Sequence, residues 1–366
     1  MNDKLGLYIH IPFCSGKCPY CDFYSKAVRT EDVLKYTDEL LKSIEYWSKQ
    51  TNRKITSVYF GGGTPNMLGT DNLCKVLNKV FDCFNVLEEA EITTELNPTY
   101  SDSINFIKLK TCGFNRLSFG MQSANDDELK ILGRKHTTDE VKKVIELAQN
   151  AGFSNISLDL MLGVPKQTKE SLKKSIEFCS SCKVKHISAY ILKVEENTPF
   201  YKNKDILDIP DEDTQADLYS FACEQLENLG YYQYEISNFA NEGFESKHNL
   251  TYWQCEEYIG IGPSAHSFFN GERFYYNRSF EDFYNNKIIK DCIGGTKEEY
   301  IMLNLRLSNG INFDDYKNRF NEDFPTDILK SAEKFKKFGL LDITDKCIKL
   351  NKKGFLLSNA IISELI

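Results

Sequence analysis

The sequence predicts an α/β protein: an open, three-quarter (β/α)6 barrel of the TIM type, followed by a C-terminal α+β region. Short β-rich runs alternate six times with amphipathic segments of helical length, a pattern typical of parallel sheets. A cysteine, glycine or polar residue stands at or just past the end of each run, where barrel strands converge on one mouth. Six units are fewer than the eight of a closed barrel. A doubly wound sheet has the same local signature.

The predicted strands are rich in β-branched and aromatic residues. They are Gly6–Ile11, Ile55–Phe60, Glu91–Leu96, Arg116–Met121, Ile156–Leu162 and His186–Leu192. The segments between them carry apolar residues at helical spacing. The clearest are Val33–Trp47, Asp71–Phe84, Asp126–Asn150 and Lys169–Cys182. A charged connection from Tyr201 to Thr214 then leads into a further helix, Gln215–Asn228.

Composition indicates a globular, cytoplasmic protein. Of the 366 residues, 41% are hydrophobic and 27% charged, which is ordinary for a globular chain. A balance of 45 basic against 53 acidic residues gives a net charge of −8, so we expect no nucleic-acid partner. Twelve cysteines without a secretory signal or a membrane-spanning run indicate a reducing compartment.

Three cysteines follow the first predicted strand within eight residues. Cys14, Cys18 and Cys21 have the spacing C-x3-C-x2-C. Three thiolates can hold three corners of a cubane iron–sulfur cluster and leave the fourth iron open to a non-protein ligand. One alternative is a zinc site, in which His10 could supply the fourth ligand, and another is a set of ordinary buried cysteines.

A glycine-rich loop, Gly61–Pro65, follows the second predicted strand. Its backbone can approach a ligand closely because glycine has no Cβ, although a plain glycine turn has the same sequence. It lacks the spacing of a phosphate loop and of a dinucleotide fingerprint. Polar residues end the later strands: Glu95, Asn97, Gln122, Asp159 and Tyr190. A barrel brings such residues to one mouth, which predicts a shared pocket.

Four motifs together resemble the radical S-adenosylmethionine (SAM) superfamily, and within it oxygen-independent coproporphyrinogen III oxidase and its relatives. The motifs are Tyr8–Cys14, Phe60–Pro65, Leu132–His136 and Asp159–Pro165. The resemblance covers nearly the whole chain and implies a 4Fe-4S cluster on the three cysteines, with SAM at the open iron. It implies that SAM is bound by Tyr8, Tyr20, Gly62, Gly63, Thr64, Glu95, Gln122, Arg134 and Asp159.

The chemistry of SAM agrees with these residue types. Arg134 can bind its carboxylate, and Glu95 and Asp159 can each accept from its amino group or ribose. Without the resemblance, a solvated residue on a helix is the better interpretation of Arg134.

An aromatic-rich segment after the barrel contains the pattern H-N-x-x-Y-W, from His248 to Trp253. An imidazole beside flat rings suits an axial heme ligand, whereas a packed histidine with both ring nitrogens hydrogen-bonded is the simpler alternative. The pattern resembles the heme-chaperone branch of the family. The oxidase branch has a long N-terminal extension and a fourth cysteine two residues past the cluster motif, where this chain has Phe23.

The resemblance therefore implies a chaperone that binds heme and delivers it to acceptor hemoproteins, respiratory and membrane-associated ones among them. Coproporphyrinogen III dehydrogenase activity is not expected. A genuine oxidase is the alternative, and a radical SAM enzyme acting on another substrate is the third.

Three segments are expected along the chain. Residues 1–230 form the radical SAM core, 231–296 a linking region with the H-N-x-x-Y-W pattern, and 297–366 a winged-helix-like module. The module is predicted from helix patterns followed by two short strands around an Asp345-Lys346 turn and a last helix. A C-x-x-C pair, Cys179 and Cys182, falls within a helical pattern and is predicted to pack in the core.

Overall fold

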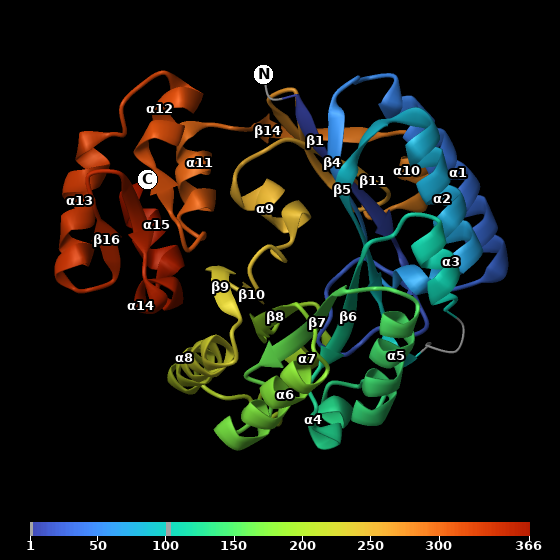
Figure 1. The fold of residues 1–366 in the computed structure, drawn as a ribbon, viewed down its shortest axis with the longest axis horizontal. Helices are drawn as coiled ribbons and strands as arrows, with labels where there is room; N and C mark the ends of the chain where they lie inside the picture. The colour runs from blue at the N-terminus through green and yellow to red at the C-terminus, as the bar shows by residue number, and fades with distance from the viewer. Residues whose placement is uncertain (1–2, 100–103) are drawn as a thin grey trace.

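The computed structural model describes residues 3–99 and 104–366, and its centre is a twelve-stranded sheet. Six of these strands run parallel and side by side: β1 (Lys4–Ile11), β4 (Lys54–Gly62), β5 (Asn85–Leu96), β6 (Arg116–Gln122), β7 (Asn155–Leu162) and β8 (His186–Ile191). They are the six strands expected from the sequence. β1 and β8 do not pair with each other, so the barrel is open, which confirms the predicted fold class (Figure 1).

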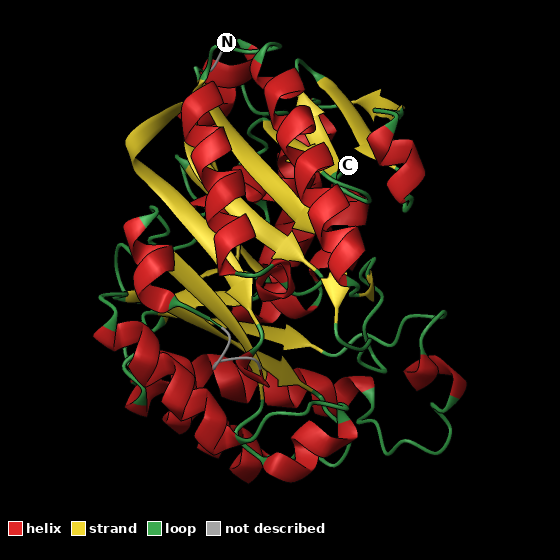
Figure 2. Cartoon of the chain, turned by 90° about the vertical axis from the view of Figure 1, so that its right-hand side faces the viewer, coloured by secondary structure: helices red, strands yellow, loops and turns green. Residues whose placement is uncertain are grey.

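Helices of the βα units lie outside the curved sheet, as Figure 2 shows. They are α1 (Thr30–Ser48), η1 (Pro65–Leu68), α2 (Thr70–Cys83), α3 (Phe106–Thr111), α4 (Asp126–Ile131), α5 (Thr138–Asn150), α6 (Lys169–Ser181), α7 (Pro199–Lys202) and α8 (Glu212–Asn228). Each longer helix buries one apolar stripe, such as Leu40 and Ile44 of α1, in the main core. Cys179 and Cys182 are buried in the same core, as expected for packing residues.

The predicted helical segment Asp126–Asn150 is two helices, because a loop separates α4 from α5. Gly133 has a φ of +66°, which glycine adopts readily and which ends α4. Thr137 then starts α5 with a capping box, in which its side chain and that of Glu140 each accept from the other's backbone N–H. The break leaves Arg134 on a loop rather than on a helix.

The segment 231–296 extends both edges of the sheet. β9 (Tyr232–Glu235) and β10 (Asn238–Ala240) add to the β8 edge. Beside β1, the sheet continues through β11 (Tyr258–Ile261), β12 (His266–Phe269), β13 (Glu272–Tyr276) and β14 (Ile288–Ile293). α9 (Lys247–Trp253) packs against β4, and α10 (Phe280–Tyr284) follows β13. The divisions at residues 230 and 296 stay predictions.

The remaining chain forms a small module beside the barrel (Figure 1). Its elements are α11 (Lys297–Asn304), β15 (Ile311–Asn312), α12 (Phe313–Phe320), α13 (Thr326–Lys337), β16 (Leu341–Ile343), β17 (Cys347–Leu350), α14 (Lys352–Leu356) and α15 (Ser358–Leu365). β16 and β17 form the hairpin expected around Asp345-Lys346, and a second apolar core lies beneath it. Of the helices that the structure describes, none is long and apolar enough to cross a membrane.

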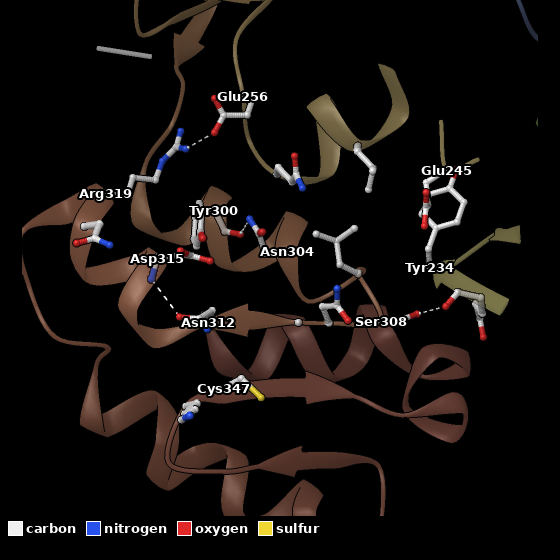
Figure 3. A pocket seen from close by; sticks show the side chains of 18 of the residues that line it. Tyr234, Glu245, Glu256, Tyr300, Asn304, Ser308, Asn312, Asp315, Arg319 and Cys347 are labelled. Carbon is white, nitrogen blue, oxygen red and sulfur yellow. Dashed lines mark hydrogen bonds and ion pairs between the residues drawn. The ribbon is translucent and has the colours of Figure 1, made fainter. Parts of the chain in front are cut away.

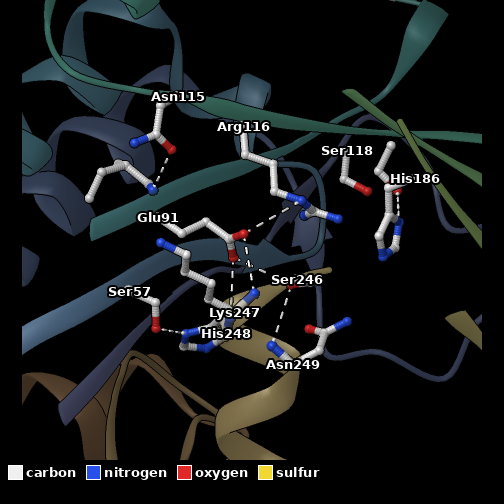
Figure 4. Close-up of polar contacts among 12 residues, drawn as sticks. Ser57, Glu91, Asn115, Arg116, Ser118, His186, Ser246, Lys247, His248 and Asn249 are labelled. Carbon is white, nitrogen blue, oxygen red and sulfur yellow. Dashed lines mark hydrogen bonds and ion pairs between the residues drawn. The ribbon is translucent and has the colours of Figure 1, made fainter. Parts of the chain in front are cut away.

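A buried charge pair anchors α9 inside the barrel (Figure 4). Glu91 of β5 and Arg116 of β6 are 5% and 2% exposed, and Arg116 Nε lies 3.9 Å from Glu91 Oε2. The backbone N–H groups of Lys247 and His248 each donate to the Glu91 carboxylate over 3.2 Å. The Ser246 hydroxyl donates to the same carboxylate over 3.4 Å. One carboxylate therefore binds the N-terminus of α9, where negative charge is favourable.

Glu91→Ala should lower the free energy of unfolding by about 3–5 kcal/mol, because the Arg116 guanidinium would stay buried without its partner. Urea unfolding at pH 7 measures the change. Lys75→Ala is the control, since it removes only the exposed pair with Asp38 and should cost less than about 1 kcal/mol. Equal losses in the two variants would contradict the anchoring role of Glu91.

Candidate functional site

The cysteine loop and the glycine-rich loop are joined through their backbones at the mouth of the barrel. The N–H of Gly63 donates to the carbonyl of Ile11 over 2.9 Å, and that of Thr64 to the carbonyl of Phe13 over 2.7 Å. The short strands β2 (Phe13–Cys14) and β3 (Lys26–Ala27) close the cysteine loop. Backbone pairing therefore brings the first two sequence motifs together.

All three cysteines of the loop are free, half-buried thiols. The Thr64 hydroxyl lies 3.3 Å from Cys14 Sγ, and Arg134 Nη1 donates to Cys18 Sγ over 3.7 Å. Burial raises the pKa of Cys21. Hydrogen-bond donors next to the sulfurs fit thiolates that ligate an iron–sulfur cluster.

His10 does not fit as the fourth ligand of a zinc site. Its Nδ1 is hydrogen-bonded to the Tyr8 hydroxyl and its Nε2 to the carbonyl of Tyr24, both at 3.1 Å. Over residues 3–99 and 104–366, no three His, Cys, Asp or Glu side chains come close enough together to hold one metal ion. The cysteines of a cubane cluster each bind a different iron, so the same three thiols remain compatible with a cluster.

Glycine is required in the second loop by contacts within the protein itself. Gly62 has a φ of +111°, and a Cβ there would lie 2.4 Å from the ring of His10. A Cβ on Gly63 would lie 2.7 Å from the carbonyl oxygen of Phe13. A larger residue would therefore clash with His10 at position 62 and with the start of the cysteine loop at position 63, independently of any ligand.

Two half-buried carboxyl groups lie next to the loops. The Tyr59 hydroxyl donates to Glu95 over 2.9 Å and the N–H of Gly62 over 3.2 Å, while the Ser118 hydroxyl donates to Asp159 over 3.2 Å. Burial, followed by the charge of Asp159, raises the pKa of Glu95 to about 7. Burial also raises the pKa of Asp159 to about 6. Carboxyl groups that titrate near neutrality are typical of functional sites.

Arg134, Tyr20 and Gln122 meet at the end of β6. Besides its contact with Cys18, Arg134 donates through Nη2 to the carbonyl of Gly120 over 2.6 Å. Burial raises the pKa of Tyr20, and the nearby Arg134 opposes this shift. Gln122 has a φ of +73°, and the register between β6 and β7 shifts between Phe119 and Gln122. The alternative of a solvated Arg134 on a helix is therefore wrong.

A cavity of about 220 Å³ opens inside the barrel. It is lined by Tyr8, Phe23, Tyr59, Gly62, Glu95, Tyr190, His248, Asn249 and Tyr252. The sequence analysis did not identify Tyr59 as a site residue. The alternation along β4 could have revealed it, because Val58 and Phe60 are core residues while the polar Ser57 and Tyr59 face the other side.

His248 is buried at this cavity, with both ring nitrogens hydrogen-bonded. Its Nδ1 lies 2.8 Å from the Ser57 hydroxyl and its Nε2 2.7 Å from the Tyr252 hydroxyl. The Tyr59 ring stacks on the imidazole at 5.1 Å. Burial lowers the pKa of His248 to about 3, so the ring is neutral at pH 7. In this conformation it matches the packed histidine described above as the simpler alternative, and metal ligation requires one nitrogen to be released.

A second, larger cleft of about 1050 Å³ lies between the barrel and the C-terminal module (Figure 3). Side chains with amides and hydroxyls dominate its lining, among them Gln233, Asn304 and Ser308. Leu250 of α9 and Gln254, which follows the helix, line this cleft, whereas His248, Asn249 and Tyr252 line the barrel cavity. α9 therefore separates the two spaces, and the predicted site residues lie on the barrel side.

Comparisons with known proteins agree with this architecture. A model of the radical SAM superfamily matches residues 8–179, and one of the HemN C-terminal domain matches residues 297–357. The chain is 35% identical to heme chaperone HemW of Bacillus subtilis across 98% of both chains. It is 33% identical to heme chaperone HemW of Lactococcus lactis across 98% of this chain and 96% of that protein.

The fold also matches a solved structure over its whole length. The structure of coproporphyrinogen III oxidase HemN from Escherichia coli superposes with a TM-score of 0.84 at 21% identity, covering 100% of this chain and 90% of that one. At this identity the match concerns the fold alone. The full-length similarity to curated relatives is more specific, and it shows that the chain belongs to the HemW family of the radical SAM superfamily.

Proposed function

We propose that this protein is a heme chaperone, which binds heme and transfers it to acceptor hemoproteins. One observation carries the proposal: the similarity to proteins named heme chaperone HemW extends over 98% of both chains. We also propose a resident 4Fe-4S cluster on Cys14, Cys18 and Cys21, with SAM bound beside it, because the radical SAM family implies both cofactors. A SAM-bound cluster of this kind supplies reductive radical chemistry when loaded.

The donor set supports these cofactors. The three thiols are uncrosslinked, and donors from Thr64 and Arg134 lie next to two of them. For SAM, Glu95 and Asp159 supply acceptors for the amino group or ribose, and Arg134 a cation for the carboxylate. Tyr8, Tyr20, Gly62, Gly63, Thr64 and Gln122 complete the proposed SAM site.

Replacing Cys14, Cys18 and Cys21 together by Ala should abolish iron binding, since no thiolate would remain in the loop. Iron analysis and absorbance after anaerobic reconstitution measure this, with about four irons per chain expected for the unaltered protein. Cys292→Ala is the control, because this exposed cysteine lies on the edge strand β14. A triple variant that retains the unaltered iron content would refute the cluster assignment.

SAM affinity should rise roughly eightfold from pH 6 to pH 7.5, since the pKa of Glu95 is raised to about 7. Below that pKa the carboxyl group is protonated and neutral, whereas above it the carboxylate attracts the SAM ammonium group. Equilibrium dialysis of the cluster-loaded protein measures the affinity. Glu95→Gln keeps the side-chain shape and should reduce the rise to about twofold, the part that Asp159 with its pKa of about 6 can contribute. An undiminished rise in this variant would exclude Glu95.

We keep His248 as the proposed axial ligand of heme, through Nε2. Ligation by this atom requires its hydrogen bond with the Tyr252 hydroxyl to break, while the hydrogen bond between Nδ1 and the Ser57 hydroxyl can remain. Burial keeps the imidazole neutral, which is the form that binds a metal.

Hemin titration should therefore give a changed Soret band and weaker retention for His248→Ala, with the cluster absorbance unaltered. Tyr252→Phe is the matched variant: it frees Nε2 and should bind hemin more tightly than the unaltered protein. Identical Soret bands in all three proteins would remove His248 as the ligand.

Transfer and oxidase activity test the function as a whole. Heme-loaded protein should convert an added apo-hemoprotein to its holo form, followed by the acceptor's own Soret band. In a parallel anaerobic reaction, the reduced, cluster-loaded protein receives SAM and coproporphyrinogen III. Catalytic formation of protoporphyrinogen without heme transfer would favour the oxidase in place of the chaperone.

A further inference from the structure

Two aromatic side chains at the mouth of the barrel are exposed. Phe23, in the cysteine loop, is 69% exposed, and Tyr190, at the end of β8, is 41% exposed. Both line the cavity of about 220 Å³ that contains Glu95 and His248. Their positions on two different elements, at the rim of one cavity, distinguish them from single surface aromatics.

The cavity is too small to enclose a porphyrin. Pockets that bury drug-sized ligands span roughly 300–1000 Å³, and heme is larger than many of those ligands. Much of the macrocycle must therefore remain outside the cavity in this conformation. The surface available to it there is the rim that Phe23 and Tyr190 form.

Basic side chains near the rim bear on where the heme propionates can lie. Arg278 pairs with the cysteine loop, where its Nη2 donates over 3.1 Å to the carboxylate of Asp22, so its charge is already balanced. Lys17 of the cysteine loop is exposed. The Lys17 ammonium group can attract a propionate of heme while the aromatic rings contact its flat face.

We propose that Phe23 and Tyr190 form an open platform on which the planar face of heme docks at the barrel mouth. The proposal rests on the chaperone function and adds the place where heme is first held, outside the cavity and before His248 ligates its iron. On an open platform one face of the macrocycle stays accessible, so an acceptor can contact heme before the chaperone releases it. The apolar faces of the rings supply the affinity, and the Lys17 ammonium group orients a propionate.

The test is hemin titration of the cluster-loaded, full-length protein with three substitutions. Phe23→Ala should weaken hemin binding about tenfold, through loss of one ring contact and its buried area, while the iron content stays unchanged. Phe23→Tyr, which retains the ring, should restore the affinity. Phe338→Ala is the matched control, since Phe338 is 74% exposed on the C-terminal module, and hemin affinity should not change.

Equal affinity of Phe23→Ala and the unaltered protein would overturn the platform and leave the chaperone function standing. Equal losses in Phe23→Ala and Phe338→Ala would also overturn it, as they would show unspecific adsorption of hemin to exposed rings. If Phe23→Ala weakened SAM binding and not hemin binding, the residue would belong to the SAM pocket. No hemin binding by the unaltered protein would reject the chaperone function together with the platform.

Discussion

The carboxylate of Glu91 determines what can occupy the inside of this barrel. A closed barrel fills its interior with layers of branched apolar side chains. Here the interior contains the Glu91–Arg116 pair, and a buried charge needs partners because its desolvation is costly. The N-terminus of α9 supplies three of them. α9 is therefore held inside the barrel by electrostatics rather than by an apolar seam.

The polar interior continues from that carboxylate across the sheet. Ser246, at the start of α9, donates its N–H to the Tyr234 hydroxyl, which is also hydrogen-bonded to His186. His186 is hydrogen-bonded in turn to Ser157 of β7. Because α9 ends this network, His248 and Tyr252 form the floor of the cavity whose upper wall carries Glu95. The candidate site is thus the space between α9, which this network holds in place, and the cysteine and glycine-rich loops at the mouth of the barrel.

This geometry bears on the choice between a chaperone and an enzyme. Enzymes that use reactive intermediates close their sites and expel water, whereas the cavity here is small and its rim exposes Phe23 and Tyr190. A carrier has the opposite requirement, since its ligand must stay within reach of an acceptor. The exposed rim is compatible with the proposed carrier.

Much of the fold followed from local pattern. β-rich runs and helical spacing predicted the six barrel strands and most of the helices around them, because burial on a sheet or beneath a helix imposes such patterns. They did not predict β11, which also runs parallel to β1. The break between α4 and α5 was not predicted, because the apolar residues continue at helical spacing across it. Gly133 ends α4 and the capping box at Thr137 starts α5 in spite of that spacing. Glu95 and Asp159 each stand at the end of a predicted strand, and the sequence therefore predicted that both lie at the mouth of the barrel. In the structure they are close enough for the charge of Asp159 to raise the pKa of Glu95.

The sequence by itself determined the order of βα units, the cysteine spacing and the family, because each depends on neighbouring residues or on motifs. Only the tertiary structure decided that Glu91 and Arg116 pair with the start of α9, and that His248 meets Ser57 and Tyr252. It also decided that position 63 must be a glycine, because a Cβ there would clash with the carbonyl oxygen of Phe13. Most of these contacts join residues far apart in the chain, and their partners follow from the curvature of the sheet, which no local pattern encodes.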